Sequence, residues 1–371
     1  MKALPAPNDD FIGLDGVLNF ATGGEPPLLQ AHRKTFENFA RDKAEGFDGY
    51  HRHWQVAERV RQKLAALVCA EPSDIGFLGS TSDGIARVVD SIDWRPGDNV
   101  LAPRLDYASG RYALGNLASQ GVELRIVAER GWRLELDDLL AACDDRTRLI
   151  YISQVNALTG QHHDMEALDR SLAARGIMLL VDASHALGVV PVRADQCDFL
   201  VGAGYKFLLG VHQGVFVWNQ RRQPDFYPSS VGWWSADTGA DPSSFQLKDD
   251  ARRAEYGNVS HLSTYLLETS LDYLAGFGVG AVAAHVRELG TSIRADLLAR
   301  GLEIMTPPEP SERGGSISFA WPDTKGLMAA ARAQDLLVWG DQGRIRISAH
   351  LFTSDADVAQ LLERLAKLVS H

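Results

Sequence analysis

The sequence predicts an α/β protein with a mostly parallel, helix-covered sheet, because strand and helix patterns alternate along most of the chain from about residue 55 onward. Short apolar runs have strand character, and segments with helical spacing of apolar residues separate them. Strands connected in this way run parallel and are buried on both faces. The predicted strands are residues 75–78, 99–102, 123–127, 148–153, 177–181, 197–201 and 214–218.

The helices of this region are predicted where apolar residues recur at helical spacing. They are residues 54–68, a helix that starts at Ser82, residues 137–142 and residues 165–175. A polar, irregular stretch at 220–253 leads into a long helical segment at about 262–298. The elements that predict a small α/β domain are strand 315–321, helix 326–333, strand 344–348 and a last helix from Asp355.

These patterns divide the chain of 371 residues into three parts, with ample material for the core of an enzyme. The parts are an N-terminal arm or small-domain segment (1–20), a large domain (21–260), and a long connecting helix with a small C-terminal domain (261–371). Strands of an open α/β sheet present their carboxyl ends along one edge, where ligands bind. We therefore expect the functional residues of the large domain to gather at that edge.

The composition is that of an ordinary globular protein, with 45% hydrophobic and 23% charged residues. A net charge of −11 argues against a nucleic acid or an anionic membrane as partner. No signal peptide and no apolar run long enough to span a bilayer is visible, so we expect a cytoplasmic protein. The three cysteines lack metal-ligand spacing, which predicts a reducing compartment and no metal site.

Two residues beside apolar runs point to pyridoxal phosphate (PLP) chemistry. Asp182 ends the run that begins at Ile177, and Lys206 lies 24 positions further on, within an apolar run of its own. PLP withdraws electrons only while its pyridine nitrogen stays protonated, and a carboxylate beside that nitrogen ensures this. A lysine among apolar residues has a lowered pKa and is a better nucleophile toward the cofactor aldehyde. Alone, Asp182 could cap a turn and Lys206 could be an ordinary surface lysine.

A phosphate site is predicted where a helix follows strand 75–78. The segment Leu78-Gly-Ser-Thr-Ser-Asp-Gly-Ile85 supplies a flexible turn and the hydroxyls of Ser80, Thr81 and Ser82. Backbone N–H groups and the dipole at a helix N-terminus bind phosphate. The alternative is an ordinary helix cap without a ligand.

Further candidate contacts follow other predicted strands. Tyr107 could stack its ring on the pyridine, or be a half-buried core tyrosine. Gln154 and Asn156 could donate hydrogen bonds to the phenolic oxygen of the cofactor. His185 could do the same, although an isolated histidine is more often structural.

Together the motifs resemble those of the class V aminotransferase family of fold-type I PLP enzymes, which holds cysteine desulfurases, selenocysteine lyases, isopenicillin-N epimerase-like proteins and kynureninases. The resemblance runs from Leu18 to the last helix. The segments that carry it are Gly79-Ser-Thr-Ser-Asp-Gly84, Asp182-Ala-Ser-His185, Ala203-Gly-Tyr-Lys206, Glu255-Tyr-Gly-Asn258 and Arg346-Ile-Ser348. It implies a fold-type I transferase, with a mostly parallel seven-stranded sheet in the large domain and a small C-terminal α/β domain.

The resemblance also assigns roles to single residues. It implies that Lys206 forms the Schiff base with PLP and that Asp182 binds the pyridine nitrogen. It implies that Arg346 grips the substrate α-carboxylate, for which the rigid guanidinium fork is suited, unless Arg346 forms a structural ion pair. Asn258 would reach the phosphate of a neighbouring subunit, which implies a homodimer with active sites at the interface. The other implied contacts are Thr81 and Ser82 to the phosphate, Tyr107 stacked on the ring, and His185 to the phenolic oxygen.

Three departures from the family pattern narrow the function. Desulfurases carry a cysteine on a loop shortly before the substrate arginine, whereas the corresponding stretch 338–344 is short and has none, so we do not expect desulfurase activity. Ala203 and Tyr205 stand where many relatives have serine and histidine, so one phosphate hydroxyl is lost and Tyr205 could supply another. Gly232-Trp-Trp-Ser235 resembles a segment of the kynureninase and epimerase-like branch, which places Trp233 or Trp234 near a neighbour's active site or within an interface.

We therefore predict a PLP-dependent enzyme that acts on a free α-amino acid, with a β-eliminating (C–S type) lyase or an aminotransferase as the leading reaction types. A racemase or epimerase is the alternative and would need a second acid or base on the opposite ring face, for which Tyr107, His51 and His53 are candidates. A PLP-fold protein that has lost catalysis and serves as a binding or regulatory partner is disfavoured by the intact Lys206, Asp182 and Arg346. A binding protein without PLP is the remotest option.

Overall fold

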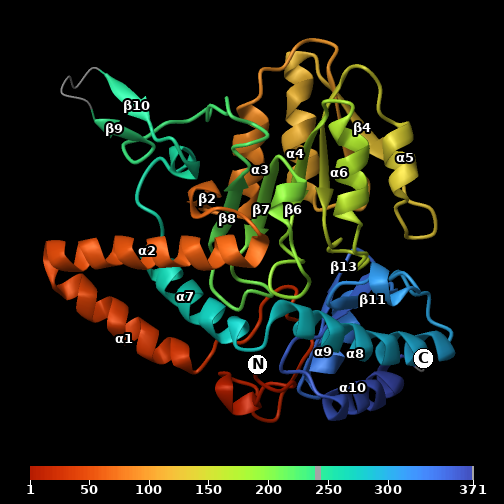
Figure 1. Ribbon diagram of the computed structural model, residues 1–371. Helices are drawn as coiled ribbons and strands as arrows, with labels where there is room; N and C mark the ends of the chain where they lie inside the picture. The colour runs from red at the N-terminus through yellow and green to blue at the C-terminus, as the bar shows by residue number, and fades with distance from the viewer. Residues whose placement is uncertain (239–243, 370–371) are drawn as a thin grey trace.

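A computed structural model describes residues 1–238 and 244–369 and shows a seven-stranded sheet at the centre of the large domain (Figure 1). The strand order is β2-β8-β7-β6-β5-β3-β4. Neighbours pair in parallel except at β8, which runs antiparallel to both β2 and β7. The prediction of a mostly parallel sheet is therefore confirmed. The strands are β2 (Ile75–Leu78), β3 (Asn99–Pro103), β4 (Glu123–Val127), β5 (Thr147–Ser153), β6 (Met178–Asp182), β7 (Phe199–Ala203) and β8 (Gly214–Trp218).

Alternate residues of each strand pack on opposite faces of this sheet, as pleated strands require. On one face, Tyr151 and Leu180 belong to an apolar cluster with α3 and α4. On the other face, Ile150 and Leu179 belong to a larger cluster with α2, α6 and α7. Asp182 lies two residues after Leu180 on β6, so its side chain points to the α3 face. The flanking helices are α2 (Gly46–Val68), α3 (Thr81–Asp90), α4 (Ala108–Asn116), α5 (Leu136–Ala141) and α6 (Met165–Ala173).

The predicted helix at 262–298 is two helices in the structure, α7 (His261–Ala275) and α8 (Val279–Ala299). The break includes Gly278, whose φ of +83° is a conformation that residues with side chains rarely adopt. α7 packs on α2 and on α1 (Ala31–Ala44), a helix that the sequence reading missed, whereas α8 packs on the small domain. The chain therefore passes between the domains at this glycine and not along one continuous helix.

The small domain contains a three-stranded antiparallel sheet in the order β11-β14-β13. Ile345 and Ile347 of β14 join the apolar core, so Arg344 and Arg346 point to the opposite face. Arg346 reaches the large domain, because its Nη1 donates to the carbonyl of Ala157 (2.9 Å). This polar face is directed at the large domain, while the helices cover the apolar face. The elements are β11 (Ser316–Ala320), α9 (Thr324–Arg332), β13 (Trp339–Asp341), β14 (Arg344–Ser348) and α10 (Asp355–Leu368).

Two short strand pairs complete the description. The N-terminal segment joins the small domain, because β1 (Leu18–Asn19) pairs in parallel with β12 (Leu336–Leu337). The stretch 220–253, predicted to be irregular, contains an antiparallel pair of β9 (Ala236–Thr238) and β10 (Phe245–Leu247), and its residues 239–243 lie outside the described residues. None of the helices described is both long and apolar enough to cross a membrane.

Candidate active site

Lys206 and Asp182 lie at the carboxyl ends of two adjacent strands, as the sequence predicts. Asp182 is the last residue of β6, and Lys206 sits in the loop after β7. A tight turn follows the lysine, closed by a hydrogen bond from Leu209 N to the carbonyl of Lys206 (2.9 Å). Leu209 has φ 60°, an uncommon and strained state for a leucine, and Ser270 of α7 holds it by donating to its carbonyl (2.8 Å). Strain of this kind is typical of functional loops.

Each carboxylate oxygen of Asp182 accepts one hydrogen bond from the protein. Oδ1 accepts from the backbone N–H of Ser184 (2.8 Å), and Oδ2 accepts from the hydroxyl of Tyr151 (3.2 Å). Gly110 leaves room for the Tyr151 ring, since a Cβ at this position would lie 2.1 Å from its Cε1. A carboxylate has about four lone pairs, so Asp182 can still accept a hydrogen bond from a protonated ring nitrogen. The sequence reading missed Tyr151, although strand alternation places it on the same face as Asp182.

The surroundings of Lys206 lower its pKa, which favours the neutral, nucleophilic form of its amine. Burial lowers the pKa of Lys206 to about 8; the carboxylate of Asp182 opposes this shift, and the cation of Arg346 adds to it. The neutral amine, which attacks an aldehyde, is therefore well populated at mildly alkaline pH. Burial, followed by the charges of Lys206 and Arg346, also holds the pKa of His185 well below its usual value, so His185 is neutral at pH 7.

Tyr107 and Tyr205 bring two aromatic rings to Lys206. The Nζ of Lys206 lies 5.6 Å from the ring centroid of Tyr107 and 5.8 Å from that of Tyr205. Tyr107 is exposed, so its ring is available for a ligand to stack on. Tyr205 stacks on His212, with the ring centroids 4.2 Å apart. The structure thus gathers both tyrosines at the lysine, while their contacts with the cofactor stay predictions.

The N-terminus of α3 presents hydroxyls beside this lysine and aspartate. The Thr81 hydroxyl lies 3.1 Å from that of Ser184, whose backbone N–H bonds to Asp182. The Ser82 hydroxyl is bonded to a serine of α4 (2.7 Å). Ser80 accepts a hydrogen bond from Asp83 N (3.1 Å) and is therefore the N-cap of α3, the alternative role that the sequence left open.

Arg346 is buried, and it makes no ion pair within the part of the chain that the structure describes. Its Nε has no hydrogen-bond partner there, and the Trp339 ring centroid lies 4.8 Å from its guanidinium carbon. Burial and the charge of Arg344 lower the pKa of Arg346 to about 9, so the guanidinium stays charged at pH 7. A buried cation without a partner is unfavourable until an anion joins it, which supports the predicted role with a substrate carboxylate.

Asn156 and Gln154, predicted to contact the phenolic oxygen of the cofactor, form hydrogen bonds within the chain in this structure. Both amide hydrogens of Asn156 are used, by the carbonyl of Leu105 (3.2 Å) and by Oδ1 of Asp106 (2.8 Å). These hydrogen bonds fix the loop that carries Tyr107, and the contact of Asn156 with the cofactor stays a prediction. Gln154 donates to the carbonyl of Pro191 (2.9 Å), and its contact with the cofactor likewise stays a prediction.

Three residues expected at a neighbouring subunit pack against α2 within this chain or lie at the surface. Asn258 accepts a hydrogen bond from the hydroxyl of Tyr50 (2.9 Å). Trp234 stacks on Trp54, with the ring centroids 3.8 Å apart, whereas Trp233 is exposed. Their predicted proximity to a second subunit stays a prediction.

His51 and His53, considered as acid or base for an epimerase, belong to α2. His53 is buried, and its Nδ1 lies 3.1 Å from the hydroxyl of Tyr265, which donates to Asp42 (2.7 Å). His51 is exposed on the same helix. Of the three candidates, only Tyr107 is in contact range of Lys206 in this structure.

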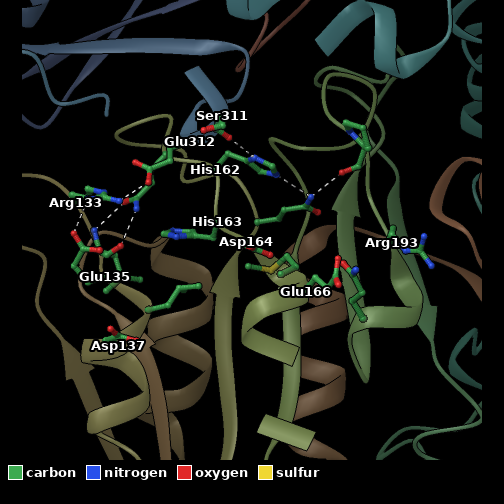
Figure 2. A pocket seen from close by; sticks show the side chains of 17 residues that line it. Arg133, Glu135, Asp137, His162, His163, Asp164, Glu166, Arg193, Ser311 and Glu312 are labelled. Carbon is green, nitrogen blue, oxygen red and sulfur yellow. Dashed lines mark hydrogen bonds and ion pairs between the residues drawn. The ribbon is translucent and has the colours of Figure 1, made fainter. Parts of the chain in front are cut away.

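A polar cavity of about 600 Å³ lies elsewhere, beside the starts of α5 and α6 (Figure 2). Arg133, His162 and His163 line it, and neither Lys206 nor Asp182 contributes. Burial lowers the pKa of both histidines, that of His163 to about 3, so both are neutral at pH 7. Arg133 pairs with acids of the same wall, as the dashed lines in Figure 2 show. The lysine and aspartate that the sequence predicts for PLP chemistry therefore lie outside this cavity.

Comparison with known proteins decides the family. The profile of the family described as Aminotransferase class-V matches residues 22–336. The chain belongs to this family. Its relatives include isopenicillin N epimerase of Amycolatopsis lactamdurans, 28% identical over 339 residues that cover 83% of this chain and 84% of that protein. Kynureninase of Burkholderia mallei (strain SAVP1) is 26% identical over 355 residues, covering 88% and 83%.

Solved structures share the fold. The apo cysteine desulfurase of Thermococcus onnurineus NA1 matches with a TM-score of 0.90 and 18% identity, over 100% of this chain and 99% of that one. A C-DES mutant with glycine covalently linked to its PLP cofactor matches with a TM-score of 0.88 and 18% identity, over 97% and 99%. The predictions of the class V family, of its fold and of a PLP-dependent enzyme are therefore confirmed.

The residues of this chain fit PLP as the cofactor. Lys206 could hold its aldehyde carbon and Asp182 its ring nitrogen, and the N-terminus of α3, whose Thr81 hydroxyl lies 3.1 Å from that of Ser184, is the predicted place for its phosphate. The cradle for that phosphate is built tightly, because a Cβ on Gly214 of β8 would lie 2.7 Å from the backbone of Ser80. A larger residue at Gly214 would push the start of α3 out of place.

The pKa of Lys206 predicts how cofactor capture depends on pH. Because the neutral amine reacts, the rate at which apoenzyme binds PLP covalently should rise about tenfold per pH unit below pH 8 and level off above it. Arg346 lowers this pKa, so Arg346→Gln should move the midpoint to higher pH. Stopped-flow absorbance from pH 6 to about 10 measures both curves. A rate that does not change across this range would contradict the assignment of Lys206 as the amine.

Proposed function

We propose that this enzyme binds a free α-amino acid and removes the proton from its Cα, with Lys206 as the base. The observation that supports this most is the buried Lys206, whose pKa of about 8 reflects its burial and the opposing charges of Asp182 and Arg346. A base is most effective when its pKa is close to the working pH. The bound cofactor would supply the electron withdrawal that makes the Cα proton acidic.

Each residue then has one task. Arg346 binds the α-carboxylate of the substrate and fixes which Cα bond faces the lysine. Asp182 keeps the ring nitrogen protonated, and Tyr151 and Ser184 keep Asp182 in position. Tyr107 covers the face of the cofactor's pyridine ring that is opposite Lys206.

A β-eliminating lyase is the reaction type that we favour, with transamination second. Persulfide formation on the enzyme needs a thiol near the substrate, and the hairpin beside Arg346 has none. Its turn consists of Gln342 and Gly343, both with positive φ, because Asp341 pairs directly with Arg344. Cys197 is buried, and burial raises the pKa of its thiol, so this cysteine is unreactive.

Epimerisation is a second candidate that one observation favours. Two-base epimerisation needs a proton donor opposite the lysine, and the exposed ring of Tyr107 lies 5.6 Å from the Nζ of Lys206. The similarity to isopenicillin N epimerase agrees with this alternative. Tyr107→Phe keeps the ring but removes the hydroxyl, so it would stop epimerisation and spare elimination.

A homodimer remains part of the proposal. Aromatic side chains are exposed around the segment that the family resemblance places at a subunit interface, namely Tyr227, Trp233, Phe245 and Tyr256. Exposed aromatic residues in such a group are typical of an interface. Analytical ultracentrifugation of the holoenzyme tests this.

The proposed function is tested by hydrogen exchange at Cα. The holoenzyme is incubated with single amino acids in D₂O, and NMR follows the Cα proton; we expect its replacement by deuterium with at least one amino acid. Ammonia and a 2-oxo acid without a change of the cofactor spectrum would indicate elimination. A 2-oxo acid with loss of the visible cofactor band would indicate transamination, and the D-enantiomer would indicate epimerisation. A holoenzyme that exchanges the Cα proton of no amino acid would overturn the proposal.

A further inference from the structure

A second buried arginine, Arg344, lies beside Arg346 on the same face of β14. The two residues are two positions apart on one strand, which places their Cα atoms roughly 7 Å apart on the face opposite Ile345. That face is the polar one, from which Arg346 reaches Ala157 of the large domain. Arg344 is 3% exposed, so it is as deeply buried as Arg346.

Arg344 makes no ion pair among the residues that the structure describes. Its Nη1 donates to the backbone carbonyl of Asp341 (3.3 Å), and its Nε has no hydrogen-bond partner in the described chain. The charge of Asp341, on the neighbouring strand, gives the main favourable influence on this guanidinium. Two buried cations on one face are thus left with backbone carbonyls and an aromatic ring as their partners.

Trp339 connects the two guanidinium groups. It faces Arg346 across the β13–β14 pair, and its ring centroid lies 4.8 Å from Cζ of Arg346 and 5.3 Å from Cζ of Arg344. The π face of tryptophan attracts cations and offsets part of their mutual repulsion, but it carries no negative charge. Neither guanidinium therefore has an ion-pair partner among the described residues, although the charge of Asp341 acts on Arg344 from the neighbouring strand.

The pair belongs to the active site. Arg344 and Arg346 both act electrostatically on His185, which lies three residues after Asp182. Arg346 acts on Lys206 in the same way. The compact β13–β14 turn keeps Trp339 close to both arginines, on the face from which Arg346 reaches the large domain.

We propose that Arg344 and Trp339 form a subsite for a second anionic group of the substrate, so that the enzyme acts on acidic amino acids of about the length of aspartate or glutamate. Arg346 takes the α-carboxylate, and Arg344 takes a carboxylate or sulfinate at the far end of the side chain. This inference rests on the proposed function, because Arg346 is taken as the α-carboxylate site.

Inert dicarboxylates test the subsite without turnover. Succinate and butyrate have chains of equal length and no amino group, so they bind without reacting, and so do glutarate and pentanoate. Binding to the holoenzyme is measured by calorimetry and by the shift of the cofactor spectrum. We expect the dicarboxylate of each pair to bind about tenfold tighter or more, because it gains one charge-assisted pair. Equal affinities within both pairs would overturn the proposal.

Variants assign the preference to Arg344. In Arg344→Gln the dicarboxylate advantage should disappear while butyrate binds as before, and Arg344→Lys should retain part of it. Arg313→Gln is the matched control, because Arg313 is equally buried in the small domain and has an unpartnered Nη1 but lies outside this pair. An Arg344→Gln protein that weakens both ligands of a pair equally would show a structural role and contradict the inference.

Thermal unfolding adds an independent readout. Removing an unpaired buried cation relieves its repulsion, so Arg344→Met should raise the midpoint of unfolding of the holoenzyme; a structural arginine would lower it on replacement. Failure of this inference differs from failure of the proposed function. In the first case amino acids exchange their Cα proton but dicarboxylates have no advantage, and in the second no amino acid exchanges whatever the dicarboxylates do.

Discussion

Replacing Lys206 by alanine is expected to abolish covalent attachment of the cofactor and to lower the rate of Cα proton exchange by about 10²- to 10⁴-fold, the usual contribution of a general base. The lysine is buried, and its pKa of about 8 suits it both to attack the aldehyde and to move the proton. Mass spectrometry after borohydride reduction shows whether the cofactor is linked to the chain. NMR in D₂O gives the exchange rate.

The control for this variant is Lys63→Ala. Lys63 lies on α2, where it forms ion pairs with Glu268 and Asp272, so its loss changes no group near the active site. This variant should keep the attached cofactor and the exchange rate. A Lys206→Ala protein with undiminished exchange would show that another base acts, and the assignment of the site would fail.

Much of the fold could be predicted from the sequence, because buried parallel strands leave a strong pattern. All seven strands of the large sheet were found, with errors of one or two residues at some ends. The helices were harder. α1 carries only three buried residues, so its apolar pattern is weak, and the break before α8 depends on the backbone conformation of Gly278. A glycine within a helical pattern does not by itself predict a break. The helix ends here because α7 and α8 pack against different parts of the molecule.

Site residues whose type is required by PLP chemistry could be predicted from the sequence. Residues whose role depends on their position in the folded chain were missed. Lys206 and Asp182 were predicted together because PLP chemistry needs both an amine and a carboxylate, and the structure places both at one edge of the sheet. The hydrogen bond from Asn156 to Asp106 was missed, because the sequence does not distinguish this buried acid from any other aspartate. Burial raises the pKa of Asp106 to about 7, and the nearby Asp182 adds to the shift. Arg344 stands two residues before Arg346 in the sequence, but the sequence does not single it out. Only the structure shows that both side chains are buried without an ion-pair partner in the described chain.

The polar network behind Asp182 sets how strongly the cofactor can withdraw electrons. Tyr151 lies close to two acids, Asp182 and Asp106. Burial is the largest cause of its raised pKa, and the charges of both acids raise it further. Because the pKa of Tyr151 is raised well above its usual value, its hydroxyl keeps its proton and remains a hydrogen-bond donor over the whole pH range of activity. Tyr151 therefore always offers its hydrogen to Asp182, which keeps the carboxylate in one orientation.

Asp182→Asn is expected to keep the cofactor attached through Lys206 but to lower Cα proton exchange by about 10²- to 10⁴-fold. Removing one partner of a buried ion pair costs about 3–5 kcal/mol, which corresponds to that range of rates. The amide has the shape of the carboxylate but no charge, so the ring nitrogen would lose its proton. The charge of Asp182 also raises the pKa of Lys206, so the pH profile of cofactor capture should move to lower pH in this variant. NMR exchange and stopped-flow capture measure the two effects separately.

Tyr151→Phe separates positioning from charge. It removes the hydrogen bond to Oδ2 of Asp182 but leaves the carboxylate, so exchange should fall by about tenfold, as expected for one hydrogen bond to a charged group. Ring packing against Gly110 is retained, which keeps the fold intact. The direct effect of the carboxylate charge on Lys206 is also kept, so the capture midpoint should stay near that of the unaltered enzyme. If Asp182→Asn lowered exchange no more than Tyr151→Phe, the charge of Asp182 would be unimportant, and the nitrogen partner would have to be sought elsewhere.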